Sequence, residues 1–348
     1  MWSKLSNRLV AAVILSMMLC VGIESCVCSE IAIPPNAIRK ISVSRCSKNP
    51  LITPASSASL GMNINGPSVI RVPSWIESPL GRYYMYFADH GGQYIRLAYA
   101  DALEGPWQIY DPGTLRLSQA KAFESHIASP DVHVDNEKKE IRMYFHGRLK
   151  EEPKRQWTGV ALSEDGLNFD ASETILGPYY FRVFQWQGFY YAMAKGRGWG
   201  QVLRSPDGLT AFESGDNFIQ RMRHAAVMIK DNHLIVFYSR KRDAPERILA
   251  STFELTDDWK KWKESGPLEV IRPEKGYEGA NFRVEESRSG KAINVCQLRD
   301  PCIFEEEGKT YLFYSISGEM GIAMAELNIV MRNSSQHYAP TAADKQPR

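Results

Sequence analysis

Short apolar and aromatic runs, separated by turn residues, recur along most of the chain. The clearest set lies between Arg299 and Leu327, where three such runs are separated by a Glu/Gly/Lys turn and a second Gly-containing turn. Runs rich in β-branched and aromatic residues and bounded by turn residues predict strands, so this stretch predicts a three-stranded meander. Four similar sets precede it, beginning near Gly66, Ser129, Pro178 and His224.

The spacing of these sets predicts how they are arranged. A period of roughly 45 to 75 residues with several strands per unit is typical of β-propeller blades and not of solenoid repeats. Five sets therefore predict an all-β fold, a five-bladed β-propeller over residues 65–330. In the lead-in 30–64, the β-like phrase Ile41-Ser42-Val43 is a candidate for an outer strand that closes the ring. The polar end of the chain, 331–348, predicts a disordered tail.

The first 29 residues have the pattern of an export signal. Lys4 and Arg8 precede the apolar run Leu9 to Ile23, and small or polar residues follow up to Ser29. This order predicts a signal peptide, residues 1–29, cleaved near Ser29. We therefore expect a secreted or periplasmic protein without stable membrane insertion after cleavage. A lipid anchor at Cys26 is the alternative, because a small residue precedes that cysteine.

Charge and cysteine content exclude several classes of function. The 348 residues include 42 Lys and Arg and 40 Asp and Glu, a formal net charge of +2. No Lys/Arg block is long enough to suggest a nucleic-acid partner. Of the six cysteines, Cys46, Cys296 and Cys302 lie beyond the signal, and their spacing matches no zinc site. We favour buried free thiols over a disulfide between Cys296 and Cys302.

A propeller brings distant residues together, because the innermost strand of every blade borders the central axis. Side chains at the first residues of these strands are therefore expected to converge in a funnel at one end of the channel. These positions carry carboxylates, histidines and arginines, where packing alone would favour small apolar residues. The predicted binding set, drawn from these positions and nearby turns, is Asn65, Asp89, His90, His126, Arg182, Trp186, His224 and Arg299.

The repeats and two short motifs together resemble a known superfamily. An Ala-Ser-Pro-Asp-Val segment (Ala128 to Val132) lies in the second blade, and Arg-Asp-Pro (Arg299 to Pro301) opens the fifth. Over about residues 65–327 the chain resembles the five-bladed propeller glycoside hydrolases of the arabinanase, levansucrase and invertase group, especially family 43. The resemblance implies hydrolysis of an oligo- or polysaccharide by paired carboxylates, without a cofactor. A structural Ca²⁺ in the central channel is compatible with such a fold.

Three carboxylates are the candidate catalytic residues. By similarity with family 43, Asp131 takes the role of the aspartate that orients and tunes the general acid. The family's base, an aspartate that opens the first blade, is replaced here by Asn65, and an amide cannot deprotonate water. We therefore expect Asp300, held ionised by the adjacent Arg299, to be the base. Glu278, on the insertion before the fifth blade, is expected to be the acid.

The departure at Asn65 leaves two alternatives open. Asp89, at a turn of the first blade, is another candidate base, and a carbohydrate-binding propeller without catalysis is the second alternative. In either case the positions of the funnel histidines make them candidates for hydrogen bonding to sugar hydroxyls, and Trp186 is a candidate for stacking on a sugar ring. Arg182 is a candidate for binding an acidic group such as a uronate or sulfate. Each of these residues also has an ordinary structural interpretation.

Overall fold

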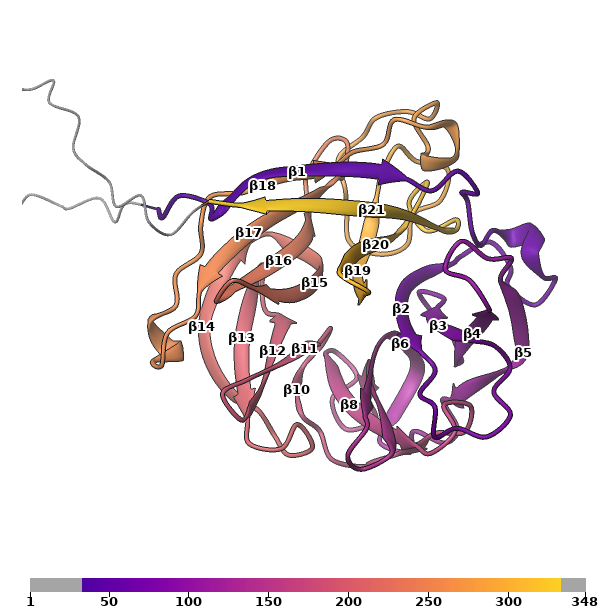
Figure 1. Cartoon of the computed structure of the whole chain (residues 1–348). Coiled ribbons are helices and arrows are strands. Elements are labelled where there is room, and N and C mark those ends of the chain that lie inside the picture. Colours follow the sequence, from indigo (N-terminus) through magenta and orange to yellow (C-terminus); the bar gives the residue numbers. More distant parts are fainter. Residues whose placement is uncertain (1–32, 333–348) are drawn as a thin grey trace, which may run out of the picture. The chain divides into compact units, whose positions relative to one another are not determined.

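The structure, a computed structural model, describes residues 33–332. The expected signal peptide (1–29), the alternative anchor at Cys26 and positions 333–348 of the expected tail lie outside this range. Within it, each of the five predicted strand sets forms one antiparallel sheet, and the sheets stand around a central channel as propeller blades (Figure 1). The all-β, five-bladed fold predicted from the sequence is confirmed.

Each blade runs from an innermost strand beside the channel to an outermost strand at the rim. Blade I contains β2 (Asn65–Arg71), β3 (Tyr83–Ala88), β4 (Tyr94–Ala100) and β5 (Gln108–Arg116). Blade II contains β6 (Phe123–Asp135), β7 (Glu140–Leu149), β8 (Gln156–Ser163), β9 (Asp170–Ala171) and β10 (Gly177–Pro178). Blade III contains β11 (Arg182–Trp186), β12 (Phe189–Lys195), β13 (Trp199–Ser205) and β14 (Glu213–Gln220).

The last two blades complete the ring. Blade IV contains β15 (Met222–Lys230), β16 (His233–Arg240), β17 (Ile248–Glu254) and β18 (Leu268–Ile271). Blade V contains β19 (Arg299–Glu306), β20 (Lys309–Ser315), β21 (Ile322–Met331) and β1 (Ile38–Arg45). Three short 3-10 helices lie in the connections: η1 (Pro54–Ser56), η2 (Trp259–Lys261) and η3 (Gly276–Glu278).

The N-terminal strand closes the ring. β1 pairs antiparallel with β21, with Val43 opposite Leu327, so the phrase Ile41-Ser42-Val43 does supply the outermost strand of blade V. Figure 1 shows the two strands side by side, although they come from opposite ends of the described chain. Ile38 is 1% exposed and packs in the cluster between blades IV and V. The first strand is therefore part of the core.

Hydrophobic clusters fill the five interfaces between neighbouring blades. Because a blade packs against a neighbour on each face, its middle strands are buried on both faces. All six residues of β3 are buried, for example. This double burial explains why the strands read as continuous apolar and aromatic runs in the sequence.

Two further observations concern cysteines and membranes. Cys296 and Cys302 are buried and free, as favoured from the sequence. Among residues 33–332, no helix has the length and apolar character needed to cross a membrane. The same part of the chain contains no group of three or more His, Cys, Asp or Glu side chains arranged to hold a metal ion.

Candidate functional site

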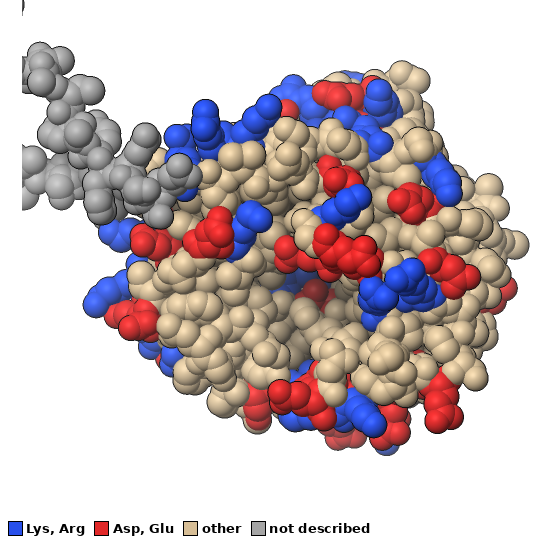
Figure 2. All heavy atoms as spheres, viewed as in Figure 1, with Lys and Arg blue, Asp and Glu red and all other residues tan. Residues whose placement is uncertain are grey.

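The first residues of the innermost strands meet in a funnel, as the propeller topology predicted. The funnel has a volume of about 120 Å³ and receives residues from all five blades. The face of the molecule shown in Figure 2 is hollowed near its centre, with acidic and basic side chains around the recess. Of the predicted site residues, those that line the funnel are Asn65, His90, His126, His224 and Asp300.

A shared β-bulge positions one residue of blades I, II and V at the funnel. Gly66, Ser129 and Asp300 have φ values of +63°, +50° and +46°, and each precedes a proline. The pairing register of β2, β6 and β19 shifts at these positions. An αL residue in a bulge re-aims its side chain, and such strain in non-glycine residues concentrates at functional sites. Asp300 is the residue whose ionisable side chain this bulge places in the funnel.

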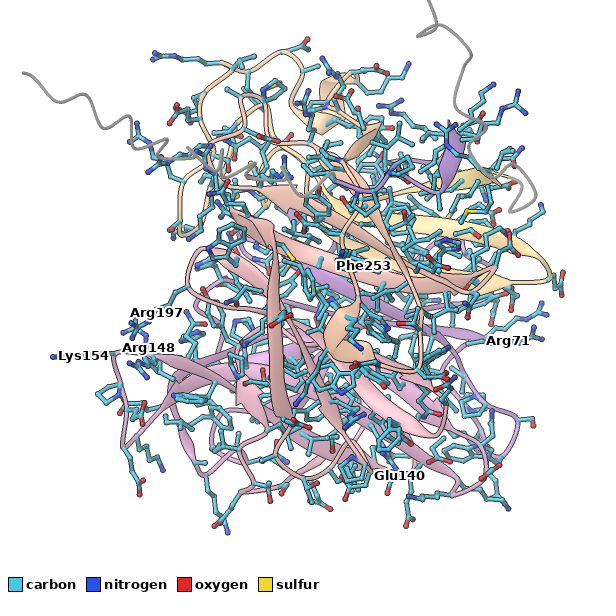
Figure 3. The ribbon with its side chains drawn as sticks, turned by 90° about the vertical axis from the view of Figure 1, so that its left-hand side faces the viewer. Arg71, Glu140, Arg148, Lys154, Arg197 and Phe253 are labelled. Atoms are coloured by element: carbon cyan, nitrogen blue, oxygen red, sulfur yellow. The ribbon has the colours of Figure 1, made fainter. Side chains whose placement is uncertain are left out.

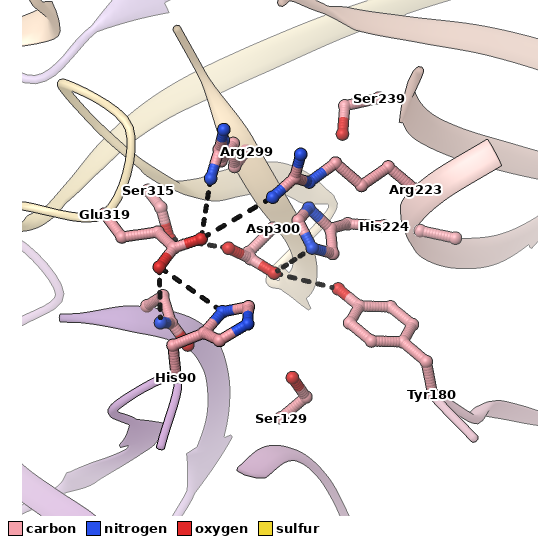
Figure 4. A network of polar contacts seen from close by, with 12 residues as sticks. His90, Ser129, Tyr180, Arg223, His224, Ser239, Arg299, Asp300, Ser315 and Glu319 are labelled. Atoms are coloured by element: carbon pink, nitrogen blue, oxygen red, sulfur yellow. Dashed lines mark hydrogen bonds and ion pairs between the residues drawn. The ribbon is translucent and has the colours of Figure 1, made fainter. Parts of the chain in front are cut away.

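Asp300 lines the funnel and has a carboxyl group with a raised pKa. It is 2% exposed, and its two oxygens accept hydrogen bonds of 3.3 Å from Tyr180 Oη and Ser315 Oγ. His224 Nε2 lies 3.4 Å from Oδ1 (Figure 4). Burial, and then the negative charge of Glu319, raises the pKa of Asp300 to about 6. Asp300 therefore keeps its proton to a higher pH than an ordinary aspartate, up to about pH 6.

Glu319 is the second carboxyl group of the funnel, and the sequence analysis missed it. Its Oε1 lies 2.7 Å from Arg299 Nη1, and its Oε2 accepts a 2.8 Å hydrogen bond from Asn63 Nδ2. His90 Nδ1 is 3.5 Å from the same Oε2. Burial opposes ionisation, but the hydrogen bond from His90 and the charge of Arg299 outweigh it and lower the pKa of Glu319. The pKa values of two carboxyl groups in one funnel are thus shifted in opposite directions.

The expected role of Arg299 was wrong. Instead of facing Asp300, its guanidinium pairs with Glu319 and with Glu246, whose Oε2 lies 2.8 Å from Arg299 Nε. Arg223 approaches the same two glutamates at 3.5 and 3.8 Å. Two buried arginines are thereby matched by two buried glutamates, as Figure 4 shows for Arg299, Arg223 and Glu319. Because no arginine is left to pair closely with Asp300, that carboxyl group keeps a raised pKa.

Burial favours the neutral form of two funnel histidines, His224 and His126. Burial, followed by the charges of Arg223 and Lys195, holds the pKa of His224 well below its usual range. Burial also lowers the pKa of His126, whose Nε2 lies 3.4 Å from Gln156 Oε1. Within the described residues, His224 Nδ1 has no hydrogen-bond partner. A neutral imidazole with a free nitrogen suits hydrogen bonding to a hydroxyl group.

Asp131 lines a different cavity from Asp300, which contradicts its expected place in the same site. The bulges align Asp131 with Ser68 of blade I and Cys302 of blade V. This position is two residues further along the innermost strand than Asp300, which corresponds to about 6.6 Å along the strand. Asp131 accordingly lines a separate cavity of about 350 Å³ at the channel. Its Oδ2 accepts hydrogen bonds from His133 Nε2 and Val183 N at 2.9 and 2.7 Å.

Glu278 is a structural residue, so its expected role as the acid was wrong. It is fully buried, and its carboxylate binds Arg45 Nε at 2.7 Å and Tyr314 Oη at 2.8 Å. The backbone N–H groups of Glu274 and Lys275 also donate to it. These contacts tie the insertion to strands β1 and β20 of blade V, away from the funnel lining.

Three predicted binding residues also lie elsewhere. Arg182 is buried and donates to the carbonyl oxygens of Ala225 and Phe181, so it braces the channel instead of facing a ligand. The ring of Trp186 packs edge-on against Trp262 at 5.6 Å in the cluster between blades III and IV. Asp89 caps the backbone of its own turn at Gly91 N, 2.8 Å away, and is absent from the funnel lining.

The missed residues share one topological position. In an antiparallel blade the end of the second strand lies beside the start of the first, so the loop between the second and third strands also faces the funnel. Glu319, Lys195 and Lys241 all lie in or next to these loops. The same rule applied to the sequence would have identified them.

Comparison with known proteins shows relatives at two levels of similarity. No model of a known protein family matches the chain. An uncharacterized protein of Acanthamoeba polyphaga mimivirus is 38% identical over 301 residues, which cover 76% of this chain and 84% of that protein.

Solved structures match at the level of the fold. A putative glycoside hydrolase of Parabacteroides distasonis superposes with a TM-score of 0.59 at 13% identity, covering 83% of this chain and 97% of that one. A family 43 β-xylosidase/α-arabinofuranosidase from a compost microbial metagenome, solved with xylotriose, gives a TM-score of 0.57 at 13% identity, covering 84% and 96%. The resemblance to the five-bladed family 43 hydrolases is thus confirmed for the fold.

Proposed function

We propose that this chain, which belongs to the same protein family as the mimivirus protein, is a glycoside hydrolase acting on an oligo- or polysaccharide. The observation that carries the proposal is the carboxyl pair of the funnel, Asp300 and Glu319, whose pKa values move in opposite directions. Glycosidic bonds are hydrolysed by one protonated and one ionised carboxyl group. The fold shared with family 43 enzymes supports the same conclusion.

In this proposal Asp300 is the proton donor. Burial and the adjacent negative charge raise its pKa to about 6, so in mildly acidic solution it carries the proton that a general acid requires. Asp300 lines the funnel, in which the glycosidic oxygen would bind in this proposal. This role reverses the expectation that Asp300 would be the base.

Glu319 supplies the ionised carboxylate beside the donor. Arg299 and the hydrogen bond from Asn63 keep it charged. A carboxylate in this position stabilises the positive charge that develops on the sugar ring in the transition state. Neutral His224, with its free Nδ1, is a hydrogen-bonding partner for a sugar hydroxyl. The export pattern of residues 1–29 supports action outside the cytoplasm.

A carbohydrate-binding propeller without catalysis is the second candidate, and Asn65 favours it. The amide of Asn65 donates to Asn63 Oδ1 at 2.9 Å and to Glu319 Oε2 at 3.4 Å. Blade I therefore contributes no carboxylate to the funnel lining. A site that had lost a base at this position would still bind a sugar.

Incubation of the full chain with a panel of oligosaccharides, with products followed by mass spectrometry, separates the two candidates. We expect cleavage of at least one oligosaccharide, and a loss of about 10²- to 10⁴-fold in rate for Asp300→Asn. The exposed Glu326→Gln is a matched control that should cleave as the wild type does. Full activity of Asp300→Asn would refute the assignment, and binding without any product would favour the second candidate.

A further inference from the structure

A strongly basic groove of about 770 Å³ lies next to the funnel. It is formed by the loops between the second and third strands of blades II, III and IV. The lining includes no Asp or Glu but six basic side chains: Arg148, Lys154, Arg155, Lys195, Arg197 and Lys241. Arg148, Lys154 and Arg197 gather at one side of the molecule in Figure 3.

The six basic side chains of this groove have no close carboxylate partner among the described residues. None of the six side chains makes an ion pair or a side-chain hydrogen bond with any residue from 33 to 332. Some arginines elsewhere, such as Arg204, Arg247 and Arg272, do have a carboxylate partner. Since the whole chain has a net charge of only +2, six unpaired cations in one groove are a local feature. Such a concave, single-sign surface attracts anions.

The groove and the funnel are continuous. They share four lining residues: Gln156, Tyr179, Lys195 and Lys241. Lys195 stands at the junction, with its ammonium 5.3 Å from the centre of the Tyr179 ring. Burial, followed by the charges of Arg223 and Lys241, lowers the pKa of Lys195 to about 7. A bound anion beside Lys195 would offset this repulsion.

Two buried polar groups that line these cavities have no hydrogen-bond partner among the described residues. The indole N–H of Trp157, which lines the groove, is buried and has no hydrogen-bond acceptor among the described residues. His146 lines the funnel, is 7% exposed, and has a similarly unpartnered Nδ1. A buried donor is costly to leave unpaired, so an indole N–H in a basic groove points to an oxygen acceptor supplied by a ligand.

From these observations we infer that the substrate is an acidic saccharide, with its carboxylate, sulfate or phosphate groups held in the groove and its scissile bond in the funnel. This inference rests on the proposed function for the identity of the ligand as a glycan. A glycan is favoured over a nucleic acid because the groove leads to the Asp300 and Glu319 pair. The neighbouring groove also explains how a funnel of only about 120 Å³ could serve a longer chain.

Binding to the full chain tests the inference independently of hydrolysis. Calorimetric titration in low salt would use oligogalacturonate, a chondroitin sulfate tetrasaccharide, a phosphorylated mannose oligosaccharide, a neutral arabino-oligosaccharide and a single-stranded DNA 12-mer. We expect one anionic oligosaccharide to bind at least about tenfold more tightly than the neutral one, and added salt to weaken it. The three anionic probes distinguish which acidic group is recognised.

Paired variants identify the surface responsible. Arg148→Gln with Arg197→Gln should weaken binding of the anionic oligosaccharide roughly tenfold. Arg39→Gln with Lys40→Gln removes two exposed charges from the outer strand β1 and should leave binding unchanged. Equal effects of the two double variants, equal binding of neutral and anionic probes, or tighter binding of DNA through the groove would overturn the inference.

The outcomes also separate this inference from the proposed function. Hydrolysis of a neutral oligosaccharide, unaffected by Arg148→Gln with Arg197→Gln, would overturn the inference and leave the hydrolase proposal intact. Groove-dependent binding of an acidic saccharide that is never cleaved would support the inference and contradict the hydrolase proposal.

Discussion

Asp300→Asn should change the pH dependence of stability in a defined direction. The folded-state pKa of Asp300 is about 6, against about 3.9 for an aspartate in an unfolded chain. Ionising Asp300 is therefore harder in the folded protein, and stability is lost as the pH rises from the unfolded to the folded pKa. A difference of about 2 in pKa corresponds to about 3 kcal/mol in all, of which roughly half falls between pH 5 and pH 8.

Asparagine is a suitable replacement because it stays neutral and tolerates the φ of +46° at this position. Relative to the wild type, Asp300→Asn should gain about 1.5 kcal/mol of unfolding free energy between pH 5 and pH 8. Urea denaturation followed by tryptophan fluorescence at several pH values measures this difference. A difference that is independent of pH, or that falls as the pH rises, would refute the reasoning.

Asp131→Asn is the matched control, with the opposite sign. Burial opposes the ionisation of Asp131, but His133 and Arg182 outweigh it and lower its pKa. Its contribution to stability is therefore present above the unfolded pKa and is lost as the pH falls through the folded pKa. Asp131→Asn should destabilise near pH 5 and progressively less in stronger acid.

Two further substitutions test the structural corrections by chemical denaturation. Glu278→Ala leaves Arg45 without its buried partner and should lower the free energy of unfolding by about 3–5 kcal/mol. The control Glu274→Ala removes a side chain that is 57% exposed beside the same arginine and should lower it by less than about 1 kcal/mol. Equal costs would mean that Glu278 is solvated after all. Ile38→Ala should cost about 2–5 kcal/mol, because Ile38 is 1% exposed in the core, and the exposed Lys40→Ala should be nearly neutral. A small effect of Ile38→Ala would place β1 outside the cooperative fold.

The fold is well predicted from the sequence because the middle strands of every blade are buried on both faces. Strands such as β3 are apolar at every position, so their runs are visible without knowledge of their partners. Convergence of the first-strand residues also follows from topology alone. Asn65, His224 and Asp300 were placed at the funnel in this way.

The errors have identifiable physical causes. Asp131 was misplaced because it lies two residues beyond the bulge of its strand, whereas Asp300 lies in the bulge itself. The two side chains therefore lie at different positions along the channel. Glu278 was misread because its partner, Arg45, is 233 positions away in the sequence. The pKa of Asp300 is raised first by burial and then by Glu319, while Arg299 pairs with Glu246 and Glu319, and no local sequence pattern reveals these contacts.

The pH dependence of kcat/KM on a cleaved oligosaccharide tests the central claim most directly. If Asp300 delivers its proton from a carboxyl group with a pKa of about 6, kcat/KM should fall about tenfold per pH unit above that value. A kcat/KM that stays constant from pH 5 to pH 8 would contradict a proton-donating Asp300.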